Sequence, residues 1–159
     1  MANKIIEDQL IKETLASAKT IAMVGVSSIK KEVSSNIIRR PSIIVMKYLQ
    51  EFGYRVIPVN PFSVGQKIYG EDVVGKLEDI SIPIDIVDVF RPSKEASIFA
   101  RQTVKINAKA FWLQYGIQSK EAEEIVKLEK ISYIENKCIK QEYQRLFLNM
   151  SPVFPALKK

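Results

Sequence analysis

The 159-residue sequence contains no histidine and only one cysteine. Without histidine, the chain lacks the commonest general base, the Ser-His-Asp and Cys-His hydrolase arrangements, and most catalytic zinc sites. One cysteine allows no internal disulfide, and without histidine it cannot build a structural zinc site. Much hydrolytic and metal-dependent chemistry is therefore excluded before any motif is considered.

Long apolar runs are also missing. No segment approaches the ~20 residues that a membrane span needs. Residues 1–8 carry acidic side chains where a signal peptide would have its apolar core. Because the lone cysteine also favours a reducing compartment, we expect a cytoplasmic protein with no membrane partner.

The composition that remains is that of an ordinary globular protein. Hydrophobic residues make up 47% of the chain and charged residues 26%, which excludes disorder and a collagen-like fibre. The net charge of +6 is a weak indication of an anionic partner. A chain of this length buries about 70% of its unfolded surface on folding, so we expect one domain over residues 1–159.

Strand patterns alternate with helical patterns along the chain. Apolar runs predict strands at residues 20–26, 54–59, 84–89, 110–113 and 132–134, with a further short strand near residues 72–74. Amphipathic patterns predict helices at residues 5–17, 41–52, 93–106, 119–128 and 140–148, followed by a tail over residues 149–159. Gly53 is predicted to end the second helix, and Ser93 and Ser119 to cap the third and fourth.

This alternation predicts an α/β fold: a single Rossmann-like, doubly wound parallel sheet in three layers, α/β/α. With strand order 3-2-1-4-5-6, the order reverses between the first and fourth strands. Ligands of such folds bind beyond the carboxyl ends of the strands at the reversal. The candidate site is therefore formed by residues 25–28, 60–61 and 89–91.

The segment after the first strand has features of a phosphate-binding loop. Gly25 allows a close backbone approach, Ser27 and Ser28 supply hydroxyl groups, and the helix beginning at Pro41 and Ser42 offers free N–H groups. Four basic residues against one acid make the segment positive: Lys30, Lys31, Arg39 and Arg40. Neither G-x-G-x-x-G nor a P-loop motif is present, and a basic surface loop is the alternative interpretation.

The ends of the second and fourth strands complete the candidate site. A dinucleotide-binding protein usually places a carboxylate at the end of its second strand, whereas this chain has Asn60 and Pro61, which disfavours NAD. After Val89, Phe90 is placed to pack against a base and Arg91 to meet a phosphate. The alternatives are that Phe90 belongs to the core and that Arg91 is a surface cation.

Other residues with chemical potential have structural interpretations. The spacing of Asp85 and Asp88 points their side chains to opposite faces of a strand, which argues against a catalytic pair. Trp112 is predicted to be a core residue. The Cys138 thiol either pairs with a thiol ligand or is a small buried side chain after the last strand.

Several short runs occur in a specific order along the chain. They are Gly25-Val26-Ser27-Ser28, Arg40-Pro41-Ser42, Gly-Tyr-Arg-Val-Ile-Pro-Val-Asn-Pro at residues 53–61, Val-Asp-Val-Phe-Arg at residues 87–91, and Trp112-x-Gln114-x-Gly116. In this order the runs resemble the small stand-alone bacterial CoA-binding proteins, over residues 20–146. The chain departs from the usual pattern at Ser28-Ile29-Lys30-Lys31, where a proline is common.

The resemblance implies a Rossmann-like domain related to the CoA-binding domain of the succinyl-CoA synthetase alpha subunit. The ligase reaction is not implied, because that enzyme carries phosphate on a histidine. We expect non-catalytic binding of coenzyme A or an acyl-CoA. The phosphates of the ligand would lie near Ser27, Ser28, Arg40, Pro41 and Ser42. Its adenosine would lie beside Asn60 and Pro61. Val89, Phe90 and Arg91 would form the opposite side of the binding site.

Two alternatives come from other functional classes. The first is an enzyme or nucleotide sensor that uses NAD(P) or an acyl-CoA. The second is a nucleic-acid or protein interaction module that uses a basic surface. The basic residues are scattered through several elements, so we expect no nucleic-acid partner.

Overall fold

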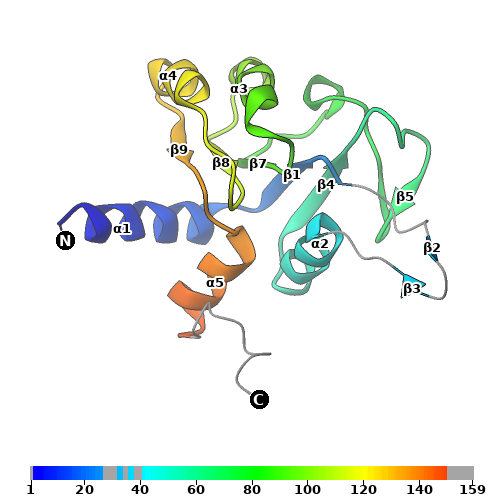
Figure 1. The fold of residues 1–159 in the computed structure, drawn as a ribbon, viewed down its shortest axis with the longest axis horizontal. Helices are drawn as coiled ribbons and strands as arrows, with labels where there is room; N and C mark the ends of the chain where they lie inside the picture. The colour runs from blue at the N-terminus through cyan, green and yellow to red at the C-terminus, as the bar shows by residue number, and fades with distance from the viewer. Residues whose placement is uncertain (1, 27–31, 34–35, 38–40, 150–159) are drawn as a thin grey trace.

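A parallel five-stranded sheet forms the centre of the computed structural model, which describes residues 2–26, 32–33, 36–37 and 41–149 (Figure 1). The strands of the sheet are β1 (Thr20–Val24), β4 (Arg55–Val59), β7 (Ile86–Val89), β8 (Ala110–Leu113) and β9 (Ser132–Ile134). The helices are α1 (Ala2–Ser17), α2 (Pro41–Glu51), α3 (Ala96–Lys105), α4 (Lys120–Leu128) and α5 (Ile139–Phe147). The shorter elements are β2 (Glu32–Val33), β3 (Asn36–Ile37), β5 (Lys67–Ile68), β6 (Glu71–Asp72), η1 (Leu77–Asp79) and η2 (Ser93–Glu95).

The strand order is β4-β1-β7-β8-β9, so β1 lies between the second and third long strands of the chain. All four neighbouring pairs are parallel. The predicted reversal of strand order beside the first strand is therefore confirmed.

The prediction of a further sheet strand near residues 72–74 is wrong. Residues 67–72 instead form the antiparallel hairpin of β5 and β6. Tyr69 and Gly70 at its tip both have positive φ, +48° and +86°, as a tight two-residue hairpin turn requires. Only Val74 reaches the sheet, through a single parallel bridge to Val59.

The alternation of side chains along the strands creates two cores. Ile21, Met23 and Trp112 point to the face covered by α1, α2 and α5. Ala22 and Phe111 point to the opposite face, covered by α3 and α4. Figure 1 shows these helices on the two sides of the sheet. The predicted doubly wound, three-layer α/β arrangement and the buried Trp112 are thus confirmed.

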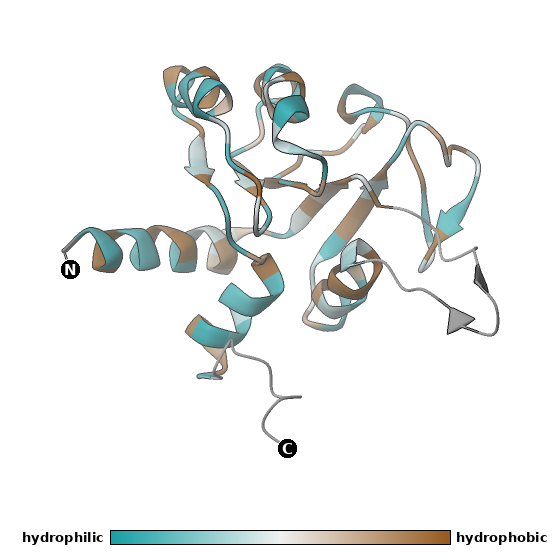
Figure 2. Ribbon diagram, viewed as in Figure 1, coloured by the Kyte–Doolittle hydropathy of each residue, from teal (hydrophilic) through white to brown (hydrophobic). Residues whose placement is uncertain are grey.

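Hydrophobic residues are concentrated in the central strands, whereas the helices carry both kinds of residue (Figure 2). This is the distribution expected when helices cover both faces of a parallel sheet. Among the residues that the structure describes, no helix combines the length and the apolar composition needed to cross a membrane.

Two of the three predicted helix boundaries are confirmed. Ser119 caps α4, because its side chain accepts a hydrogen bond from the Ala122 N–H at 3.0 Å. Gly53 follows α2 with a φ of +98°. The prediction for Ser93 is wrong, because Ser93 begins the short helix η2 and α3 starts three residues later. The Ser93 hydroxyl instead accepts the N–H of Gln118.

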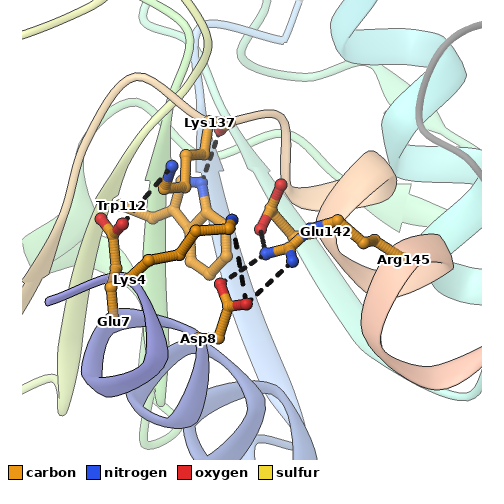
Figure 3. A network of polar contacts seen from close by, with 7 residues as sticks. All are labelled: Lys4, Glu7, Asp8, Trp112, Lys137, Glu142 and Arg145. Carbon is orange, nitrogen blue, oxygen red and sulfur yellow. Dashed lines mark hydrogen bonds and ion pairs between the residues drawn. The ribbon is translucent and has the colours of Figure 1, made fainter. Parts of the chain in front are cut away.

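A polar network joins the first and last helices (Figure 3). Arg145 of α5 donates two hydrogen bonds to Asp8 of α1, at 2.8 and 3.0 Å, and a third to Glu142. The hydrogen bonds between Arg145 and Asp8 lower the pKa of the Asp8 carboxyl. Lys137 pairs with Glu7, and its carbonyl accepts the Trp112 indole N–H at 2.8 Å. The network therefore fixes α1 and α5 to each other and to the sheet.

Candidate functional site

The carboxyl ends of β4, β1 and β7 meet at the reversal of strand order. The Gly25 N–H donates to the Val59 carbonyl at 2.9 Å, and the Phe90 N–H donates to the Val24 carbonyl at 2.9 Å. Since these contacts connect all three strands just beyond their ends, the structure brings together the predicted site residues at positions 25, 60 and 89–91.

Two features favour glycine at position 25. Its φ of +95° lies in the region that favours glycine. A Cβ atom at this position would also lie 3.0 Å from Cδ and 3.2 Å from Cγ of Arg91. The Arg91 side chain therefore lies directly against the Gly25 backbone.

Asn60 holds the ends of β1 and β4 together. Its side-chain amide donates to the Val26 carbonyl at 2.8 Å, and its side-chain oxygen accepts the Phe62 N–H at 2.8 Å. Pro61, which follows, is exposed. Both ends of the Asn60 amide are thus engaged within the protein.

The three predicted site residues at the end of β7 and just after it have different environments. Val89 is fully buried in the core beneath α3, so only its backbone is available at the edge. Phe90 is half-buried and packs against the other core. Arg91 is exposed and pairs with Glu95, with Nε–Oε1 at 2.9 Å and Nη2–Oε2 at 2.8 Å. This hydrogen bonding raises the pKa of the Arg91 guanidinium and lowers that of the Glu95 carboxyl.

The beginning of α2 contributes the remaining described residues. Pro41 is its first residue and is exposed, and Ser42 is buried. The first N–H groups of an α-helix have no partner within the helix. Ser27, Ser28 and Arg40 lie outside the described residues, and so do Lys30, Lys31 and Arg39.

Two residues near this edge were missed by the sequence reasoning. Glu95 was not predicted, although its position four residues after Arg91 is a spacing at which opposite charges pair on a helix. Gln114, just after β8, is buried, and its side-chain oxygen accepts the Ile139 N–H at the start of α5. No local pattern predicts this second contact, because it joins residues 25 positions apart.

Asp85 and Asp88 have separate environments. Asp85 lies at the opposite end of the sheet, where its carboxylate accepts the backbone N–H groups of Lys19 and Thr20. Asp88 is 0% exposed, and among the residues that the structure describes neither of its oxygens has a hydrogen-bond partner. Burial raises its pKa well above the ordinary value. In register it lies between Met23 and Trp112.

Cys138 directly precedes α5 and is half-buried against the core of the α1, α2 and α5 face. Its carbonyl accepts the Glu142 N–H. A role for the thiol stays a prediction. Within the described ranges, no group of three or more Cys, Asp or Glu side chains is arranged to hold a metal ion.

The fold and the arrangement of residues at the carboxyl ends of β4, β1 and β7 together define a Rossmann-like α/β protein. Its candidate site lies where the strand order reverses. Comparison with protein families then gives its relationship. The chain belongs to the CoA binding domain family, whose model matches residues 19–144.

Individual proteins are similar to this chain over most of its length. YneT, an uncharacterized protein of Bacillus subtilis (strain 168), is 37% identical over 130 residues, which cover 82% of this chain and 89% of YneT. The structure of cell-free ID.343 from Thermus thermophilus is 38% identical, with a TM-score of 0.77 over 88% of this chain and 98% of that one. A hypothetical protein from Pyrococcus horikoshii OT3 is 35% identical, with a TM-score of 0.76 over 87% and 91% of the two chains.

Proposed function

We propose that this protein binds coenzyme A or an acyl-CoA without catalysing a reaction, and that it holds the nucleotide and phosphate portion at the reversal of strand order. The observation that carries the proposal is the placement of Arg91 against Gly25 at this edge, in a chain that belongs to the CoA binding domain family.

The charges of the ligand suit this edge. The phosphate groups of CoA are strong hydrogen-bond acceptors, and they favour guanidinium groups and the free N–H groups of helix N-termini. In the proposed complex the phosphates lie near Arg91 and the beginning of α2 at Pro41 and Ser42. Ser27, Ser28 and Arg40 add hydroxyl groups and charge from the adjoining segment.

The environment of Asn60 supports CoA over NAD. A dinucleotide-binding site uses a carboxylate at this position to hold the adenosine ribose. Here the residue is an amide, and hydrogen bonds to Val26 and Phe62 engage both of its ends. Asn60 and Pro61 then act as a wall beside the adenosine rather than as a ribose ligand.

The separation of Asp85 and Asp88 supports binding without chemistry. A pair of carboxyl groups would have been the simplest acid–base arrangement for a chain without histidine. Asp85 is committed to backbone N–H groups at the far end of the sheet. Asp88 is buried beneath the surface.

Isothermal titration of the purified protein with CoA, acetyl-CoA, NAD, NADP and ATP tests this proposal. We expect micromolar binding of CoA or acetyl-CoA and none of NAD or NADP. Arg91→Ala should weaken CoA binding by about tenfold or more, because a charge-assisted hydrogen bond to phosphate is lost.

Arg55→Ala provides the matched control. Arg55 also forms a two-bond pair with a glutamate, Glu71, but it is the first residue of β4 and lies at the end of the sheet opposite the candidate site. Its replacement should leave CoA affinity unchanged. Binding of NAD(P) in place of CoA would overturn the proposal, and so would equal effects of the two arginine variants.

A further inference from the structure

The Arg91 side chain lies against the Gly25 backbone at the candidate site. Its Cγ and Cδ atoms occupy the space directly beside Gly25, the residue that permits a close backbone approach at the end of β1. A phosphate that approaches Gly25 from the side where a Cβ would lie therefore meets Arg91, and it either displaces the side chain or binds to its guanidinium.

The guanidinium already has a partner in the protein. Glu95 accepts hydrogen bonds from Nε at 2.9 Å and from Nη2 at 2.8 Å, the side-on arrangement that occupies one edge of the group. Glu95 is held in place because η2 fixes its backbone, where its N–H donates to the Pro92 carbonyl. The Glu95 side chain is 26% exposed and that of Arg91 46%, so water screens the pair only in part.

This arrangement places a carboxylate within the site of a proposed polyanion. The Glu95 charge cancels that of Arg91 and repels a phosphate group that approaches the same guanidinium. A terminal phosphate monoester carries more negative charge than a carboxylate and offers three acceptor oxygens, so it competes effectively for the arginine.

We propose that Glu95 is an internal competitor of the ligand for Arg91, and that a phosphate group of the bound ligand takes over the guanidinium edge that Glu95 holds in this structure. Glu95 thereby sets the affinity of the site and favours ligands that bring a phosphate to Arg91. This inference rests on the proposed function, since it requires that a phosphate-bearing ligand bind at this edge.

Titration of CoA into four proteins tests the competition: the wild type, Glu95→Gln, Arg91→Ala and the double variant. Glu95→Gln should tighten CoA binding by about three- to tenfold. This is the effect expected when a carboxylate that competes for Arg91, and that water screens in part, loses its charge. In the Arg91→Ala background the same replacement should change the affinity by less than about twofold, because the contested group is absent. Glu95→Ala, which also removes the carboxylate, should tighten binding with the same dependence on Arg91.

Glu71→Gln is the matched control, because it removes the same charge from the equivalent pair with Arg55 and should leave CoA affinity unchanged. Weaker or unchanged binding of CoA by Glu95→Gln would overturn the inference, and weaker binding would show that Glu95 orients Arg91 instead. The proposed function would stand in both cases. Failure of the wild type to bind CoA would instead remove the proposed function, and the inference with it.

Discussion

Asp8 and Arg145 are 137 positions apart in the sequence and are joined by two hydrogen bonds (Figure 3). The contact ties the first helix to the last. Because both side chains are less than one-third exposed, the pair is screened less than an ordinary surface ion pair.

Arg145→Met should destabilise the protein by about 1–3 kcal/mol, because the buried Glu142 loses its charged partner and Asp8 keeps the more distant Lys4, at 3.9 Å. Urea unfolding at pH 7 measures the difference. Lys47→Met is the control: the Lys47–Glu51 pair on α2 is more than half exposed, so this change should cost little. An Arg145→Met variant as stable as the wild type would contradict the importance of the network.

The stability of Asp88→Asn relative to the wild type should increase as the pH rises. The pKa of Asp88 is raised in the folded protein, so the folded state holds a proton that the unfolded chain releases above about pH 4. The contribution of the Asp88 carboxyl to the stability of the folded protein is greatest below the pKa that this group has in the unfolded chain. The contribution falls by about 1.4 kcal/mol per pH unit as the pH rises towards the pKa of the group in the folded protein. The neutral amide does not titrate.

Urea unfolding of the wild type and Asp88→Asn at pH 5 and pH 8 measures this effect. The stability of the variant relative to the wild type should be greater at pH 8 than at pH 5. Any constant cost of burying the amide cancels in this comparison. A relative stability that is the same at both pH values would show that Asp88 titrates normally in the folded chain.

Gly25→Ala should both destabilise the protein, by about 1–2 kcal/mol, and weaken CoA binding by about tenfold. The first effect comes from its positive φ, and the second from the displacement of Arg91 by the added methyl group. Thermal unfolding and calorimetric titration measure the two effects separately.

Gly53→Ala separates the two causes. Gly53 has nearly the same φ, +98°, but an added Cβ there would meet no atom within 4 Å. This variant should therefore lose a similar amount of stability and keep its affinity for CoA. Equal affinities of the two alanine variants would argue against a role of the Gly25–Arg91 contact in binding.

The architecture could be predicted because its determinants are local. Continuous apolar runs mark strands buried on both faces, and they gave β1, β4, β7, β8 and β9 within a few residues. The hairpin of β5 and β6 was missed because Tyr69 takes a positive φ, which a tyrosine seldom does. The cap at Ser93 was missed because an extra turn, η2, precedes α3.

The chemistry of the candidate site could be predicted only in part. The meeting of residues 25, 60 and 90–91 follows from the general geometry of a doubly wound sheet. The contact of Arg91 with Gly25 and the hydrogen bond of Asn60 to Val26 depend on side-chain directions that no spacing reveals. The roles of Ser27, Ser28 and Arg40 remain predictions.

Gln114 gives α5 and the sheet a common point of attachment. Its backbone N–H donates to the Val89 carbonyl at the end of β7, and its side chain accepts the Ile139 N–H at 3.2 Å. Helix α5 therefore cannot slide along the sheet without breaking a buried hydrogen bond, which is costly. The residue that aligns the last helix thus also contacts the end of β7, directly before Phe90 and Arg91, so the same residue holds α5 and the candidate site in place relative to the sheet.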